Sequence, residues 1–135
     1  MSESIFIDTS AFYALMDRSD QFHVKAASVW PSLLGEGISL QTGNYIVIET
    51  LALIQNRLGF DAANMWYRDV LAVVELIWTE EALHWNAFDL WLSFGRRKLS
   101  LVDCVSFILM RKKRIEKVFA FDRHFLDHGF EIIPR

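Results

Sequence analysis

Two aspartates of this chain stand where apolar runs end, a position at which carboxylates can do chemistry together. Asp8 follows the apolar run 5–7, and Asp122 follows the apolar run 118–121. Taken singly, each is explained by helix capping, because Asp is a favoured N-cap residue. In open α/β sheets, however, ligands bind beyond the carboxyl ends of the strands. Two such aspartates therefore favour a shared acidic crevice, provided that the two strands are neighbours.

Two further acids lie in apolar segments with helical spacing. Glu49 sits within 45–54, which is apolar on nearly every helical face. Carboxylates are rarely buried without a partner, so Glu49 is expected to pair with an arginine, to reach solvent or to bind a metal ion. Asp103 follows Ser100 at the spacing of a capping box, which is a structural role. Because a capping carboxylate has a second oxygen, this role is compatible with metal binding.

The elements that must position these acids alternate between strands and helices. The expected strands are 5–8, 38–40, 73–78, 118–122 and 131–133. The expected helices are 9–16, 22–34, 44–58, 60–71, 80–94 and 100–114, with Asn44 as the N-cap of the third and Gly59 as its end. This alternation predicts an α/β fold, a three-layer α/β/α sandwich with a mostly parallel central sheet.

Bulk composition points to one globular domain over residues 1–135. The chain is 53% hydrophobic and 23% charged, which excludes a disordered chain. No run approaches the roughly 18 apolar residues of a membrane span, and no signal peptide is recognised, so a cytoplasmic protein without a membrane partner is expected. Cys104 is the only cysteine, which excludes an internal disulfide and a zinc site made of several cysteines.

The net charge does not decide whether nucleic acid is a partner. A value of −3 is unfavourable for contacts with phosphate. Half of the 14 basic residues, however, lie in two short runs, 96–98 and 111–114. The second run is expected at a helix C-terminus, where cations complement the helix dipole. The first run precedes Asp103 directly and is the better candidate for holding an RNA backbone.

Four segments together resemble the PIN-domain family, and in particular the VapC-type ribonucleases, the toxins of type II toxin–antitoxin pairs. They are Asp8-Thr9-Ser10 after a strand, Glu49 in its apolar helix, the helix opening 99–104 and the segment 119–125. The resemblance covers essentially the whole chain, including the closing segment 129–134. One departure is Val102, where relatives often place Thr or Ser.

This resemblance implies a metal-dependent endoribonuclease. Asp8, Glu49, Asp103 and Asp122 match the acidic catalytic and metal-binding site of the family. Magnesium, with manganese as an alternative, suits such a set because it prefers oxygen ligands and keeps several waters. We expect Asp8 and Asp103 to bind the ion directly, and Glu49 and Asp122 to complete the site through water or a second ion. The implied partners are an RNA substrate and a cognate antitoxin protein.

Other functions remain as alternatives. The first is a catalytically inactive PIN-fold domain that binds RNA or a partner protein, against which the presence of all four acids argues. The second is a phosphoacceptor receiver-like domain, but Asp8 has no acidic neighbour of the kind such domains use. The third is a dehalogenase-type phosphatase, which would have Asp-x-Asp where this chain has Asp8-Thr9-Ser10.

The expected helix 80–94 is apolar around much of its circumference. Trp85 and Phe88 lie on one side, and Leu83 and Trp91 on another. Core packing explains most of these residues. A helix that is apolar on two sides also suits a dimer face or a groove for a partner helix, so a homodimer is expected.

Overall fold

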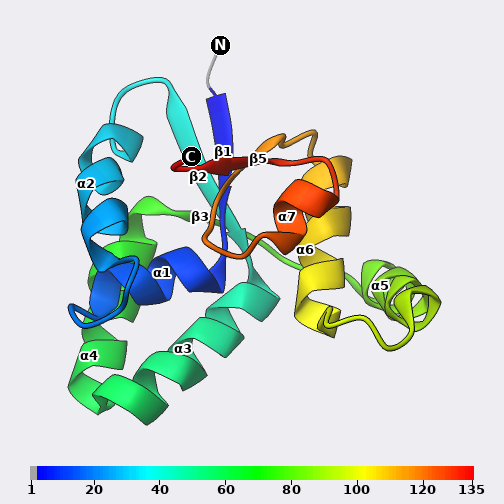
Figure 1. The fold of residues 1–135 in the computed structure, drawn as a ribbon, viewed down its shortest axis with the longest axis horizontal. Coiled ribbons are helices and arrows are strands. Elements are labelled where there is room, and N and C mark those ends of the chain that lie inside the picture. Colours follow the sequence, from blue (N-terminus) through cyan, green and yellow to red (C-terminus); the bar gives the residue numbers. More distant parts are fainter. Residues whose placement is uncertain (1–2) are drawn as a thin grey trace.

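The centre of the molecule is a five-stranded sheet in the order β3-β2-β1-β4-β5, with every strand parallel to its neighbours (Figure 1). The structure is a computed structural model that describes residues 3–135, so the predicted domain 1–135 begins with two residues outside the described range. The strands are β1 (Glu3–Ile7), β2 (Ile38–Gly43), β3 (Glu75–Ile77), β4 (Lys117–Phe119) and β5 (Glu131–Ile133).

Helices cover both faces of this sheet, which confirms the predicted three-layer sandwich (Figure 1). One layer holds α1 (Thr9–Met16), α2 (His23–Leu33), α3 (Asn44–Leu58) and α4 (Phe60–Met65). The other holds α5 (Glu81–Phe94), α6 (Leu101–Lys112) and α7 (His124–Asp127). Within residues 3–135, no helix has both the length and the apolar character needed to cross a membrane.

The path of the chain creates a topological switch point beside β1. From β1 the chain moves outward to β2 and β3, and then returns to form β4 on the other side of β1. Connections that leave a sheet in opposite directions open a crevice at the carboxyl ends of the two central strands. The residues that follow β1 and β4 therefore face the same crevice.

The core lies on both faces of β1, because the strand is buried from both sides. Phe6 and Ile7 have no solvent exposure, and Phe119 of β4 is equally buried. A parallel strand between two helical layers is expected to be a continuous apolar run, and residues 5–7 show that pattern in the sequence.

The third helix begins differently from the prediction. Gly43, not Asn44, occupies the N-cap position. A Cβ atom at Gly43 would lie 2.8 Å from Leu109 Cδ1, so a larger residue there would have to displace the Leu109 side chain of α6. The Asn44 side chain instead accepts a hydrogen bond from the Thr79 backbone N–H at 2.7 Å. This hydrogen bond connects the loop after β3 to the start of α3.

The segment predicted as one helix over 60–71 is divided. The α-helix ends at Met65 and continues as a π-helical turn (Trp66–Val70) and a 3₁₀ turn (Leu71–Val73). Trp66 is completely buried and packs edge-on against Phe12 at 5.1 Å between ring centroids. The predicted strand 73–78 is accordingly shorter and begins only at Glu75.

Candidate active site

Asp8 is the most deeply buried acid of the crevice and is held by a neighbouring hydroxyl. Its Oδ2 accepts hydrogen bonds from Ser10 N at 3.1 Å and Ser10 Oγ at 2.6 Å, so it caps α1 as the sequence indicated. Ser10 Oγ in turn accepts a hydrogen bond from Phe121 N at 3.0 Å. One serine thus ties the end of β1 to the loop after β4.

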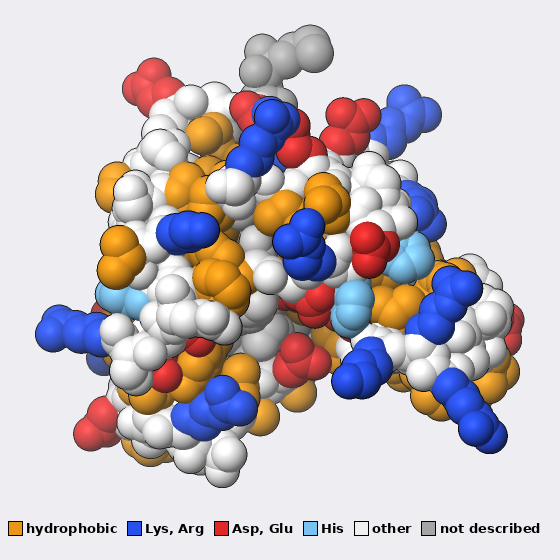
Figure 2. Space-filling view, in the orientation of Figure 1, with side chains coloured by type: hydrophobic (Ala, Val, Ile, Leu, Met, Phe, Trp, Pro, Cys, Tyr) orange, Lys and Arg blue, Asp and Glu red, His pale blue; other side chains and the backbone are white. Residues whose placement is uncertain are grey.

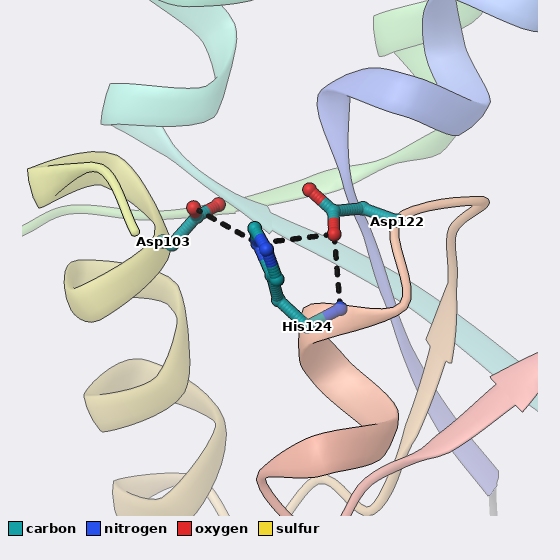
Figure 3. Close-up of side chains that lie close together, drawn as sticks. All are labelled: Asp103, Asp122 and His124. Atoms are coloured by element: carbon teal, nitrogen blue, oxygen red, sulfur yellow. Dashed lines mark hydrogen bonds and ion pairs between the residues drawn. The ribbon is translucent and has the colours of Figure 1, made fainter. Parts of the chain in front are cut away.

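Asp103 forms the predicted capping box at the start of α6. Its backbone N–H donates to Ser100 Oγ at 3.0 Å, and its Oδ2 accepts from Ser100 N at 3.1 Å. The box fixes the carboxylate at a helix N-terminus, where the helix dipole favours negative charge. Its side chain is only 15% exposed and faces the crevice beside Asp122 (Figure 3).

Asp122 lies three residues beyond the end of β4, not at the end of a strand as predicted. The strand ends at Phe119 because the backbone then turns, with Phe121 N–H donating to Ser10 rather than to another strand. Asp122 Oδ1 accepts a hydrogen bond from His124 N at 2.9 Å, just before α7 begins. The turn still directs the carboxylate toward Asp103 (Figure 3).

Glu49 completes the acidic set from α3. It lies at the surface beside the exposed Ile48, so it reaches solvent rather than being enclosed by the apolar helix. Nearby, Tyr45 and Val102 line a hollow of about 340 Å³ together with Glu49. Among residues 3–135, no lysine or arginine pairs with Glu49, so of the three alternatives for this acid, solvent and a metal ion remain.

The charges of Asp103 and Asp122 act on the other acids of the crevice. Burial raises the pKa of Asp8 to about 7, against the opposing bonds from Ser10, and the charges of Asp103 and Asp122 add to the rise. Loss of solvent also raises the pKa of Glu49, which feels the same two charges. The pKa of Asp103 is raised by burial first and by Asp122 in addition. The crevice therefore holds an excess of negative charge.

The donor set fits a divalent cation. Buried charges in proteins are paired or bound to metals. Within residues 3–135 these carboxylates have no lysine or arginine partner, and the imidazole of His124 is the one nitrogen-bearing side chain paired with them. Three groups offer atoms that all lie within 4.8 Å of one another, namely Asp103, Asp122 and His124. Asp8 and Glu49 lie outside this group of three, although both feel the charges of Asp103 and Asp122.

His124 belongs to this cluster, although the sequence analysis did not include it in the site. Its Nδ1 lies 3.1 Å from Asp122 Oδ1 and 3.7 Å from Asp103 Oδ2 (Figure 3). The only signal in the sequence was its place two residues after Asp122. His23, in contrast, lies outside this cluster, and its Nδ1 contacts Ala14 O at 2.7 Å.

A basic hollow borders the acidic crevice. It has a volume of about 260 Å³ and is lined by Arg97, Lys98, Leu99, His124, Asp127 and His128. Because His124 belongs to both, the hollow and the acidic cluster are continuous. In Figure 2, acidic side chains lie in a depression near the centre of the face, with histidine and basic side chains to the right of it. A phosphate chain crossing this face would meet both.

An all-parallel sandwich with acids beyond the carboxyl ends of its central strands has its ligand-binding crevice at the topological switch point. The sequence matches the PIN domain over residues 5–131. The chain belongs to the PIN-domain family.

Its relatives include a VapC protein. The chain is 34% identical over 132 residues to the 23S rRNA-specific endonuclease VapC20 of Mycobacterium tuberculosis, covering 96% of this chain and 98% of the relative. The crystal structure of M. tuberculosis VapC20, described as a Sarcin-Ricin loop cleaving toxin, superposes with a TM-score of 0.83 at 33% identity, over 93% of this chain and 95% of that chain.

More distant structures share the fold alone. VapBC2 of Rickettsia felis, bound to a DNA fragment from its promoter, gives a TM-score of 0.73 at 7% identity over 96% of each chain. FitAcB of Neisseria gonorrhoeae gives 0.68 at 14% identity over 95% of each chain. These matches confirm the predicted fold class.

Proposed function

We propose that this chain is a metal-dependent endoribonuclease and the toxin of a toxin–antitoxin pair, acting in the cytoplasm. The observation that carries the proposal is the grouping of Asp103, Asp122 and His124 within 4.8 Å of one another. Asp8 and Glu49 feel the charges of these two aspartates, and a hollow that contains Arg97 and Lys98 lies beside the group. The 34% identity to an rRNA-specific endonuclease supports RNA as the substrate class.

Bound at this site, Mg²⁺ or Mn²⁺ would neutralise charge on the scissile phosphate and make water a better nucleophile. Asp8 and Asp103 are proposed as direct ligands, and Glu49 and Asp122 as the groups that complete the site. Both bonds from Ser10 reach Oδ2 of Asp8, which leaves Oδ1 for a ligand. The capping box likewise holds Asp103 rigidly, so the carboxylates need little rearrangement when they bind.

The proposal is tested by incubating purified chain with bacterial ribosomes and with isolated 23S rRNA. We expect discrete RNA fragments in the presence of Mg²⁺ or Mn²⁺ and none when a chelator is in excess, because the acids alone repel the phosphate. Fragments that form at the same rate in excess chelator would contradict the metal dependence. Tight RNA binding without any cleavage, in all metals, would favour the alternative of an inactive PIN-fold binding domain.

The toxin role is tested separately, by producing the chain in bacterial cells. VapC20 is described as a toxin, and the proposal extends that role to this chain together with a cognate antitoxin protein. Overproduction of the chain alone should arrest bacterial growth. Co-expression with the product of an adjacent antitoxin gene should restore it. Harmless overproduction of a soluble, RNA-cleaving chain would contradict the toxin role and leave the nuclease activity untouched.

The basic hollow gives a prediction about RNA affinity. The double variant Arg97→Ala/Lys98→Ala should bind RNA several-fold more weakly. A plot of the logarithm of its binding constant against the logarithm of the salt concentration should also be less steep, by roughly 0.7 in slope for each phosphate that is no longer neutralised. Binding is measured by fluorescence anisotropy at several salt concentrations, in an Asp8→Asn background that does not cut the probe. The matched control is Lys112→Ala/Lys113→Ala, which removes the same charge at the opposite end of α6. Equal effects in both pairs would contradict a local role for the hollow.

The homodimer expected from the sequence stays a prediction. It is supported by the exposed aromatic and aliphatic side chains on and before α5, where Trp78 is 70% exposed, and Trp85 and Leu92 are each 55% exposed. A stable interface should bury about 1,200 Å² or more in total and be rich in such residues. Light scattering at micromolar concentration measures the mass, and a strict monomer would contradict the dimer.

A further inference from the structure

The imidazole of His124 points into the acidic cluster rather than into solvent. Figure 3 shows it between the carboxylates of Asp103 and Asp122, which come from α6 and from the loop after β4. Its Nδ1 lies 3.1 Å from Asp122 Oδ1 and 3.7 Å from Asp103 Oδ2. These spacings are those of three groups arranged around a common centre, because all three ligand atoms lie within 4.8 Å of one another.

The local fold fixes this orientation. His124 is the first residue of α7, and its backbone N–H donates to Asp122 Oδ1 at 2.9 Å. The same carboxylate oxygen therefore anchors the backbone and faces the ring. Asp103 is held independently by its capping box on α6. Two separate elements thus bring an imidazole and two carboxylates together.

The Nδ1 atom also lacks a hydrogen-bond partner. It is buried, and no group within residues 3–135 gives it a hydrogen bond of good geometry. Buried polar atoms in proteins nearly always have a partner, whether protein, water or an ion. A nitrogen lone pair directed at two carboxylates is repelled by them unless a cation or a proton lies between.

We propose that His124 Nδ1 is a direct ligand of the divalent cation held by Asp103 and Asp122, and that this nitrogen makes the site prefer Mn²⁺ over Mg²⁺. The proposal rests on the metal-dependent function above and refines it. Mg²⁺ takes oxygen ligands almost exclusively, whereas Mn²⁺ suits carboxylates and, as a first-row transition ion, also binds at mixed nitrogen and oxygen sites. The four acids alone favour Mg²⁺, and the imidazole changes that preference.

The variant that tests the proposal is His124→Asn. The amide oxygen of asparagine stands at about the position of Nδ1, so the substitution exchanges a nitrogen ligand for an oxygen ligand and leaves the acids in place. Isothermal titration calorimetry with each metal alone should show Mn²⁺ affinity falling on the order of tenfold or more. The affinity for Mg²⁺ should change much less, so the ratio of Mn²⁺ affinity to Mg²⁺ affinity should fall. Circular dichroism establishes that the variant is folded.

His128→Asn is the matched control. It makes the same substitution four residues further along, at a histidine that borders the basic hollow but lies outside the cluster. This control should keep the native ratio of Mn²⁺ to Mg²⁺ affinity. An equal narrowing of the ratio in both variants would overturn the proposal, because it would reflect a change in surface charge rather than the removal of a ligand.

A second measurement uses the native chain and does not depend on any variant. Chain labelled with ¹⁵N-histidine is loaded with Mn²⁺, and pulsed electron paramagnetic resonance is used to detect coupling to a directly bound imidazole nitrogen. We expect the coupling in the native chain and in His128→Asn, and its loss in His124→Asn. Native chain that binds Mn²⁺ and cleaves RNA without this coupling would overturn the proposal that His124 is a ligand, and would leave the metal-dependent function standing. RNA cleavage indifferent to every metal and chelator would instead overturn the metal-dependent function.

Discussion

The Asp8→Asn variant is expected to cleave RNA at least roughly a thousandfold more slowly than the native chain. Removing one directly bound carboxylate should cost several kcal/mol of charge stabilisation in the transition state, and about 1.4 kcal/mol corresponds to a factor of ten in rate. Asparagine keeps the size of the side chain and an oxygen for the bonds from Ser10, so the fold should persist. Single-turnover cleavage of 23S rRNA measures the rate.

The matched control for this loss is Asp61→Asn, the same substitution at an exposed aspartate of α4 on the outside of the molecule. It should retain the native rate. In cells, overproduced Asp8→Asn should also be harmless while Asp61→Asn remains toxic. Cleavage by folded Asp8→Asn at the native rate would show that the acidic crevice is not the catalytic site.

The parts of this structure that the sequence predicts well are those set by local pattern. The apolar run before Asp8 could be recognised as a strand because burial on both faces leaves no polar alternation. The Ser100–Asp103 capping box could be recognised because its two hydrogen bonds span only three residues. Both predictions place an acid at the end of an element, and that was sufficient to place two of the four carboxylates.

The parts that the sequence does not predict depend on contacts between distant segments. Gly43 rather than Asn44 is the helix cap, and the Asn44 side chain bonds to Thr79 N of a distant loop, a contact that no local pattern contains. Asp122 is displaced from the strand end because Phe121 N–H bonds to Ser10, more than a hundred residues earlier in the chain. His124 joins the site through the turn that follows. Each deviation lies where the two halves of the chain meet, which is also where the crevice forms.

The metal-free chain is expected to lose stability as the pH rises from about 4 to about 7. The folded chain raises the pKa of Asp8 from 3.8 to about 7, so between these values it binds more protons than the unfolded chain does. The free energy of unfolding then falls with pH. The pKa values of Glu49 and Asp103 are raised as well and act in the same direction. Burial lowers the pKa of His128, which opposes the trend in the upper part of this range.

The contribution of Asp8 to this loss of stability is measured by comparing the native chain with Asp8→Asn. One pKa unit corresponds to about 1.4 kcal/mol, so the shift amounts to roughly 4 kcal/mol across the range. For a chain of this size that is a fall in melting temperature on the order of 10 °C. Thermal unfolding in chelator at pH 4.5 and pH 7.5 should show this fall in melting temperature in the native chain and in Asp61→Asn, and little of it in Asp8→Asn.

Saturating Mn²⁺ should raise the native melting temperature most at the higher pH, because the ion binds the ionised carboxylates and stabilises the folded state alone. A native melting temperature that is the same at both pH values, with and without metal, would contradict the burial of an uncompensated charge at Asp8.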